Sequence, residues 1–204
     1  MVSHDALAEP ALLAIAESGV MAGATGSYEK LLGDLAGVYL DDDAYQQAVA
    51  SLGADRLAYR VEVNQLDEGA GALIIGTSTV LPGRIGEEFA MTRGHLHVKS
   101  DRAELYHCIS GRGVMLMDTV AGDSRALQML PGEAVHVPGE WVHRSVNVGD
   151  EPLVTLFCYA ADAGQDYQII ADAGGMVQLV VTDGQGGWTT TPNPRHIGYR
   201  GAAA

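Results

Sequence analysis

Four side chains in the middle of the chain have the types and the spacing that suit a divalent metal ion. His95 and His97 lie two residues apart, so on an extended strand both imidazoles project to one side, about 6.5–7 Å apart at the backbone. Glu104 begins the next apolar run, and His143 follows the turn at residues 138–140. Three imidazoles and one carboxylate suit Fe, Mn, Ni, Co or Zn and leave coordination positions open for a ligand. The sequence therefore predicts a metal site.

The other histidines are expected to have other roles. His107 lies on the opposite strand face from Glu104, which predicts a packed or interface position. His136 precedes the turn and alternates with apolar residues, so we expect it in solvent or behind the ligands. His4 and His196 lie near the chain ends and are expected to be solvated.

The segments that must position these side chains are short, apolar and rich in Val, Ile, Leu and Tyr. Turns rich in Gly, Pro and Asp separate them, and helical periodicity is almost missing between Arg56 and Thr155. This texture predicts an all-β sandwich or barrel and disfavours a TIM barrel or a Rossmann fold. The expected strands are Leu57–Val63, Ala72–Leu81, Leu105–Ile109, Gly113–Thr119, Ala134–Val137, Leu153–Tyr159 and Val177–Val181.

The two ends of the chain differ from this middle part. Residues 1–55 are rich in Ala and acidic side chains, and they predict helices at Pro10–Glu17 and Asp41–Leu52. We expect this segment to form a partly helical extension, residues 56–182 to form the barrel, and residues 183–204 to form an irregular tail.

Charge and cysteine content limit the partners and the compartment. The formal net charge of −14 would repel the phosphates of nucleic acid and anionic membrane surfaces, so neither is an expected partner. Cys108 and Cys158 lie in apolar runs, which predicts reduced, buried thiols in a cytoplasmic protein. The N-terminus lacks the basic start of a secretory signal, and no apolar run is long enough to cross a bilayer.

The motif residues resemble those of the cupin superfamily. Gly94-His95-Leu96-His97, Glu104 and Gly111 fit the first cupin motif, and Gly132, Pro138, His143 and Asn147 fit the second. The six residues between His97 and Glu104 make a longer spacer than cupins usually have, and position 140 is Glu where that pattern has Gly. The longer spacer is similar to that of the cupin-type glucose-6-phosphate isomerases, whose signature fits from Thr92 through Tyr106. This likeness extends from about Glu29 to Asp172.

The resemblance implies a cupin jelly-roll barrel, a metal site, a sugar-phosphate pocket and a homodimer. The implied metal ligands are His95, His97, Glu104 and His143. The implied ion is one divalent metal per subunit, with Fe(II) expected first and Mn, Ni, Co or Zn as the alternatives. The implied pocket residues are Tyr59, Ser78, Thr92, Gly94, Tyr106, Tyr159 and Tyr167. From the residues themselves we add Arg93, because a cation in the Thr92–Gly94 turn suits a phosphate group.

The expected reaction is the interconversion of glucose 6-phosphate and fructose 6-phosphate. Glu104 would be the base if a proton moves through an enediol, and a direct hydride shift is the other open route. Tyr106 and Tyr159 would orient the sugar or relay protons to its oxygens. The family favours His where this chain has Gln165, so any role of that His does not carry over. Two alternatives stay open, namely a cupin oxygenase or decarboxylase acting on a small acid, and a non-catalytic protein that binds sugar phosphates.

Overall fold

Antiparallel strands make up most of the regular secondary structure of the protein, a computed structural model that describes residues 9–69 and 71–201. The elements of the first half are β1 (Gly26–Leu31), the 3-10 helix η1 (Leu32–Leu35), α1 (Asp42–Leu52), β2 (Leu57–Gln65), β3 (Leu73–Val80), β4 (Arg84–Ile85) and β5 (Glu88–Phe89). Those of the second half are β6 (Glu104–Ser110), β7 (Gly113–Thr119), β8 (Ser124–Met129), β9 (Ala134–Val137), β10 (Trp141–Asn147), β11 (Leu153–Ala160), α2 (Gln168–Asp172), β12 (Gln178–Thr182) and β13 (Trp188–Pro192).

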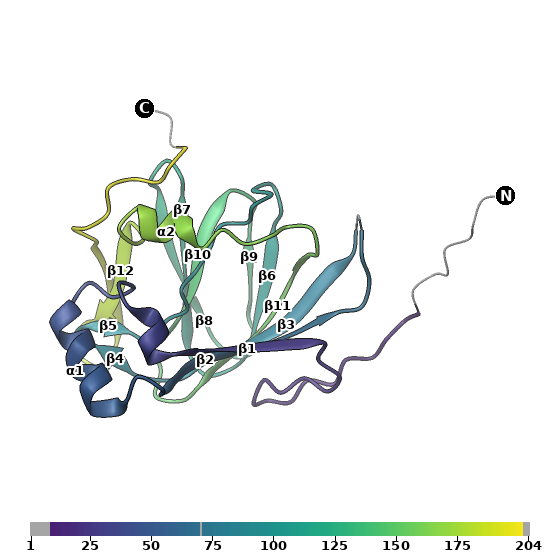
Figure 1. The fold of residues 1–204 in the computed structure, drawn as a ribbon, viewed down its shortest axis with the longest axis horizontal. Coiled ribbons are helices and arrows are strands. Elements are labelled where there is room, and N and C mark those ends of the chain that lie inside the picture. The colour runs from purple at the N-terminus through teal and green to yellow at the C-terminus, as the bar shows by residue number, and fades with distance from the viewer. Residues whose placement is uncertain (1–8, 70, 202–204) are drawn as a thin grey trace.

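Two sheets form the walls of the barrel (Figure 1). A six-stranded sheet has the order β1-β2-β3-β11-β6-β9, and it faces a three-stranded sheet with the order β10-β7-β8. Alternation along β6 puts Glu104, Tyr106 and Cys108 inside, while Leu105 is exposed. The predicted all-β cupin jelly-roll is therefore confirmed.

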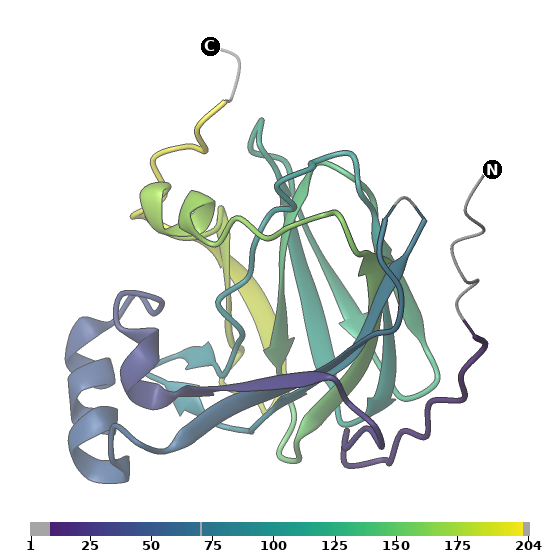
Figure 2. The same ribbon diagram turned by 45° about the vertical axis from the view of Figure 1, so that its right-hand side comes forward.

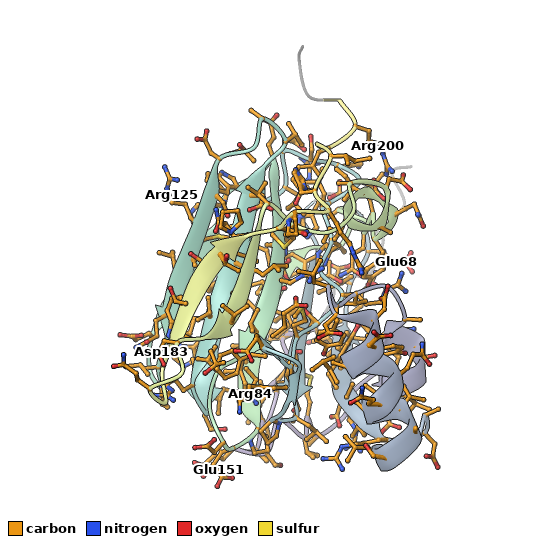
Figure 3. The ribbon with its side chains drawn as sticks, turned by 90° about the vertical axis from the view of Figure 1, so that its left-hand side faces the viewer. Glu68, Arg84, Arg125, Glu151, Asp183 and Arg200 are labelled. Carbon is orange, nitrogen blue, oxygen red and sulfur yellow. The ribbon has the colours of Figure 1, made fainter. Side chains whose placement is uncertain are left out.

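A C-terminal layer covers the outer side of the three-stranded sheet. In Figure 3 the yellow strands β12 and β13 lie against the teal strands of the barrel. The carboxylate of Asp118 on β7 accepts hydrogen bonds from the backbone N–H of Val177 (2.8 Å) and from the hydroxyl of Tyr199 (2.6 Å). Because one face of β7 and β10 meets the barrel interior and the other meets this layer, both strands are buried along almost their whole length.

The helix predicted at Asp41–Leu52 is confirmed as α1. Asp41 caps it, since its side chain accepts a hydrogen bond from the backbone N–H of Ala44 at 2.9 Å. In Figure 2, α1 and η1 lie at the side of the barrel, and the segment after β11 crosses over the strands to reach α2. No helix among residues 9–69 and 71–201 is long and apolar enough to cross a membrane.

The expected secondary structure is wrong at both ends of the chain. Pro10–Glu17 is not helical, because this segment turns at Gly19 and lies on the outer face of the six-stranded sheet, where Thr77 donates a hydrogen bond to the carbonyl of Gly19. Residues 188–192, expected to be irregular, form β13 and pair with β12. In both places the chain pairs with a neighbouring segment across a short turn, Ile15 with Met21 and β13 with β12, and this pairing outweighs local propensity.

Candidate metal centre and substrate pocket

The four predicted ligands converge from three separate parts of the chain. Glu104 is the first residue of β6, His143 lies on β10, and His95 and His97 lie on the extended segment between β5 and β6. This segment is held by an isolated bridge between His95 and His143 rather than within a named strand. All four side chains are buried, and one ligand atom from each lies within 4.8 Å of all the others.

The Nε2 atoms of the three imidazoles surround one oxygen of Glu104. The distances to Oε2 are 2.9 Å from His143, 3.2 Å from His97 and 3.6 Å from His95. His97 and His143 present their Nδ1 atoms to the backbone carbonyls of Arg102 (2.8 Å) and Trp141 (3.0 Å). A carbonyl only accepts, so Nδ1 of both rings carries a proton, and a neutral ring therefore turns its Nε2 lone pair to the carboxylate.

This arrangement fits a bound cation. Lone pairs that face a carboxylate oxygen at such distances repel each other unless a positive charge lies between them. In addition, the Nε2 atoms of His95 and His97 are buried without a hydrogen-bond partner in the described part of the chain. Three imidazole nitrogens and one carboxylate, two of the imidazoles oriented by backbone carbonyls, are a donor set that suits a divalent metal ion.

The electrostatics of the cluster keep Glu104 ionised. Burial alone would raise its pKa, but the imidazoles of His143, His95 and His97, where they carry a proton at Nε2 in place of a bound cation, hold the pKa well below its ordinary value. Burial and the neighbouring His143 lower the pKa of His95 to about 4. At neutral pH His95 is therefore a neutral imidazole, the form that binds a metal.

A pocket opens beside this cluster and encloses about 530 Å³ of space, part of it open to solvent. Its walls carry the predicted residues Tyr59, Ser78, Thr92, Gly94, Tyr106, Tyr159 and Tyr167, together with His95 and Glu104. Hydroxyl groups are frequent among these residues, which suits a ligand with many oxygen atoms.

Comparison with known proteins extends over the whole barrel. Residues 29–196 match the family described as Glucose-6-phosphate isomerase (GPI). This chain belongs to the glucose-6-phosphate isomerase family. A putative glucose-6-phosphate isomerase 1 of Rhizobium meliloti is 45% identical over 177 residues, which cover 87% of this chain and 82% of that protein. The glucose-6-phosphate isomerase of Pyrococcus furiosus is 40% identical over 179 residues, covering 88% and 92%.

A solved structure outside the isomerase family overlaps with only part of the chain. Oxalate decarboxylase of Bacillus subtilis aligns with a TM-score of 0.43 and 26% identity, covering 52% of this chain and 26% of that chain.

Several pocket residues of this isomerase-family chain escape the sequence analysis. These are Tyr28, Val61, Val63, Ser145, Phe157 and Gln165. Five of them follow from strand geometry, because residues two apart on one strand, and residues opposite each other on paired strands, share a face. Val61 and Val63 continue the face of Tyr59 on β2, Phe157 shares the face of Tyr159 on β11, and Ser145 shares that of His143 on β10. Tyr28 is opposite Val61 on β1, which the sequence analysis assigned to the N-terminal extension.

The structure does not place Arg93 with the other predicted pocket residues. Its neighbours Thr92 and Gly94 line the pocket, whereas the Arg93 guanidinium lies over the outer side of the Tyr167 ring, 5.6 Å from the ring centroid. There it lines a second cavity together with Arg144. Successive side chains of an extended segment alternate in direction, which explains why Arg93 points away from its two neighbours.

Gly94 is required by the packing around the metal centre. Its φ of +72° is a conformation that favours glycine, and a Cβ at this position would lie 2.7 Å from the carbonyl oxygen of His143 and 2.8 Å from the Cβ of Arg144. Glycine therefore lets the segment carrying His95 lie directly against β10.

The other histidines of the described residues lie apart from the candidate metal centre. His107 is half-buried and His136 is exposed, as their strand positions predict. His196 differs from the expectation, because it is half-buried and its Nδ1 lies 2.8 Å from the carbonyl oxygen of Gly175. His4 lies outside the described residues. Cys108 and Cys158 are both free, but only Cys108 is buried and Cys158 is half-buried.

Proposed function

We propose that this protein is a metal-dependent aldose–ketose isomerase that interconverts glucose 6-phosphate and fructose 6-phosphate. The observation that carries the proposal is the convergence of three imidazole Nε2 atoms on Glu104 beside a pocket lined with tyrosines. Relatives that are 40% and 45% identical over most of this chain bear the name of the same activity.

The proposed metal ligands are His95, His97, His143 and Glu104. Their buried nitrogen and carboxylate atoms suit a first-row divalent ion, and Fe(II) is the ion that we propose, ahead of Mn, Ni, Co and Zn. When bound, such an ion supplies Lewis-acid chemistry, because it polarises a carbonyl oxygen and stabilises the negative charge that develops on it.

Glu104 has two roles in this proposal. It helps to hold the ion and, if a proton moves through an enediol, its carboxylate is placed to take that proton from the sugar carbon. The three imidazoles that keep Glu104 ionised also make it a weaker base. A direct hydride shift would leave Glu104 as a ligand only.

The tyrosines in the pocket act as donors to the sugar oxygens. Burial and the nearby carboxylate of Glu104 raise the pKa values of Tyr106 and Tyr159, so both hydroxyls keep their protons at neutral pH. Tyr106 shares the inward face of β6 with Glu104, and Tyr159 is opposite Glu104 on β11. We propose that both hydroxyls orient the sugar and exchange protons with its oxygens.

The phosphate end of the sugar is proposed to bind at the wall formed by Tyr59, Ser78, Thr92, Gly94 and Tyr167. Backbone N–H groups and hydroxyls can hold a phosphate without a lysine or arginine in contact with it. We further propose that the protein works as a homodimer in the cytoplasm, and that its reaction belongs to glycolysis and gluconeogenesis.

A coupled assay on fructose 6-phosphate tests the proposal. Activity should be lost on chelation and should return when a divalent metal is added back. His97→Gln should abolish activity and metal binding, whereas His136→Gln, on the exposed face of β9, should change neither. An absence of turnover with each of Fe, Mn, Ni, Co and Zn would refute the isomerase function.

The two chemical routes need a separate measurement, because Glu104→Gln abolishes activity in either case. Slow turnover in deuterated water should place deuterium on the substrate carbon if an enediol forms. Complete retention of the substrate hydrogen would instead support the hydride shift.

A further inference from the structure

Gln165 connects two tyrosines on the wall of the pocket. The hydroxyl of Tyr167 donates a hydrogen bond to Oε1 of Gln165, and Nε2 of Gln165 donates to the hydroxyl oxygen of Tyr159 at 3.4 Å. All three side chains line the pocket beside Glu104. None of these three residues belongs to the cluster of candidate metal ligands.

A carboxamide gives its two neighbours opposite roles, because one end only accepts hydrogen bonds and the other only donates. Tyr167 therefore has its proton committed to Gln165. Tyr159 receives a hydrogen bond from Gln165, so its own proton remains available for another acceptor.

The free proton of Tyr159 lies beside the proposed metal centre. Tyr159 is opposite Glu104 in the pairing of β11 with β6, and its ring centroid is 5.3 Å from that of His97. A sugar oxygen bound at this end of the pocket is the acceptor that this position offers.

The backbone around Gln165 is fixed to the segment that carries two of the ligands. Asp166 and Leu96 exchange hydrogen bonds of 2.7 and 3.2 Å, and Leu96 lies between His95 and His97. The amide is thus anchored to the same piece of backbone as the two imidazoles.

From these contacts we infer that Gln165 is a positioning residue that fixes the hydroxyl of Tyr159 as a hydrogen-bond donor to the sugar. The inference rests on the proposed isomerase function. The role requires one hydrogen-bond donor and one acceptor, and the neutral carboxamide of Gln165 supplies both.

Gln165→Glu is the sharpest test, because it keeps the shape of the side chain, removes the hydrogen-bond donor and adds one negative charge. A carboxylate accepts from both tyrosines, so the proton of Tyr159 would turn away from the sugar. We expect kcat to fall about tenfold or more, whereas Tyr159→Phe should lower kcat about a hundredfold, as expected for loss of a positioned donor. The new charge can also raise KM, which is why kcat is the deciding quantity.

The double variant separates positioning from a general disturbance of the pocket. If Gln165 acts through Tyr159, adding Gln165→Glu to Tyr159→Phe should lower kcat no more than about twofold further. If the two losses instead multiply, the inference is wrong. Gln165→His should retain kcat within about threefold at pH 8, because a neutral imidazole also has one donor and one acceptor. Thermal unfolding of each variant identifies any that fail to fold.

A measurement without turnover keeps this inference distinct from the proposed function. The side-chain amide NMR signal of Gln165, assigned by its loss in Gln165→Glu, should move strongly in Tyr159→Phe and less in Tyr167→Phe. The opposite order would reverse the assigned roles and overturn the inference. If the wild-type protein does not convert fructose 6-phosphate, the isomerase proposal fails, while the NMR result still decides how Gln165 is oriented.

Discussion

Replacing Gly94 by alanine should weaken both the fold and the metal site. The backbone has a φ of +72° at this position, and an alanine Cβ would lie 2.7 Å from the carbonyl oxygen of His143. The same Cβ would lie 2.8 Å from Arg144 Cβ and from Ile170 Cδ1. Ile170 Cδ1 is the end of a side chain and can rotate away, but the carbonyl oxygen of His143 and the Cβ of Arg144 cannot move without shifting β10.

The size of the effect follows from two contributions. The left-handed backbone costs an L-residue about 1–2 kcal/mol. Forcing an extra methyl into a packed site costs about 1–3 kcal/mol more. We therefore expect Gly94→Ala to lower the free energy of unfolding of the metal-free protein by about 3 kcal/mol.

A shift of β10 caused by the added methyl would also separate His95 from His143, whose backbones are hydrogen-bonded to each other. N–H to carbonyl distances between these two residues are 3.0 and 2.9 Å in the two directions. A shift here disturbs the orientation of a ligand, which typically lowers metal affinity about 10- to 100-fold. Titration calorimetry with a divalent metal, together with denaturant unfolding, measures both effects.

Gly23→Ala is the matched control. Gly23 has nearly the same φ of +77°, but nothing lies within 4 Å of the position of an added Cβ. The control should lose only the backbone contribution of about 1–2 kcal/mol and retain its metal affinity. Equal losses of stability in the two variants, or an unchanged metal affinity in Gly94→Ala, would refute the packing argument.

Three further substitutions test the surroundings of the site. Asp162→Asn removes the carboxylate that binds the side chains of Lys99 and Arg102. Because the carbonyl of Arg102 orients His97, metal affinity measured by calorimetry should fall about tenfold. Burial raises the pKa of Glu88, so this carboxyl loses its proton at a lower pH in the unfolded state than in the folded state. The free energy of unfolding should therefore decline as the pH rises above about 4.5. Urea unfolding of Glu88→Gln should show a flatter dependence of this free energy on pH. Tyr199→Phe removes a donor from the buried Asp118 and should lower the free energy of unfolding by about 1–3 kcal/mol, with no decline in metal affinity.

Local sequence determined the strands of the barrel and the composition of the metal centre. Apolar runs bounded by turn residues and the alternation of strand faces depend only on neighbouring positions, so the strand at residues 113–119 and the inward face shared by Glu104 and Tyr106 follow from the sequence. The types and order of His95, His97, Glu104 and His143 likewise predicted a metal site before any distance was known.

Tertiary structure alone decided how distant segments meet. The direction of Arg93 and the bridge that Gln165 makes between two tyrosines depend on which side chains approach from other strands. Sequence thus predicted the four groups of the metal centre and seven residues of the pocket, whereas only the packing of β1, β10 and the segment after β11 added Tyr28, Ser145 and Gln165 and defined which groups face one another.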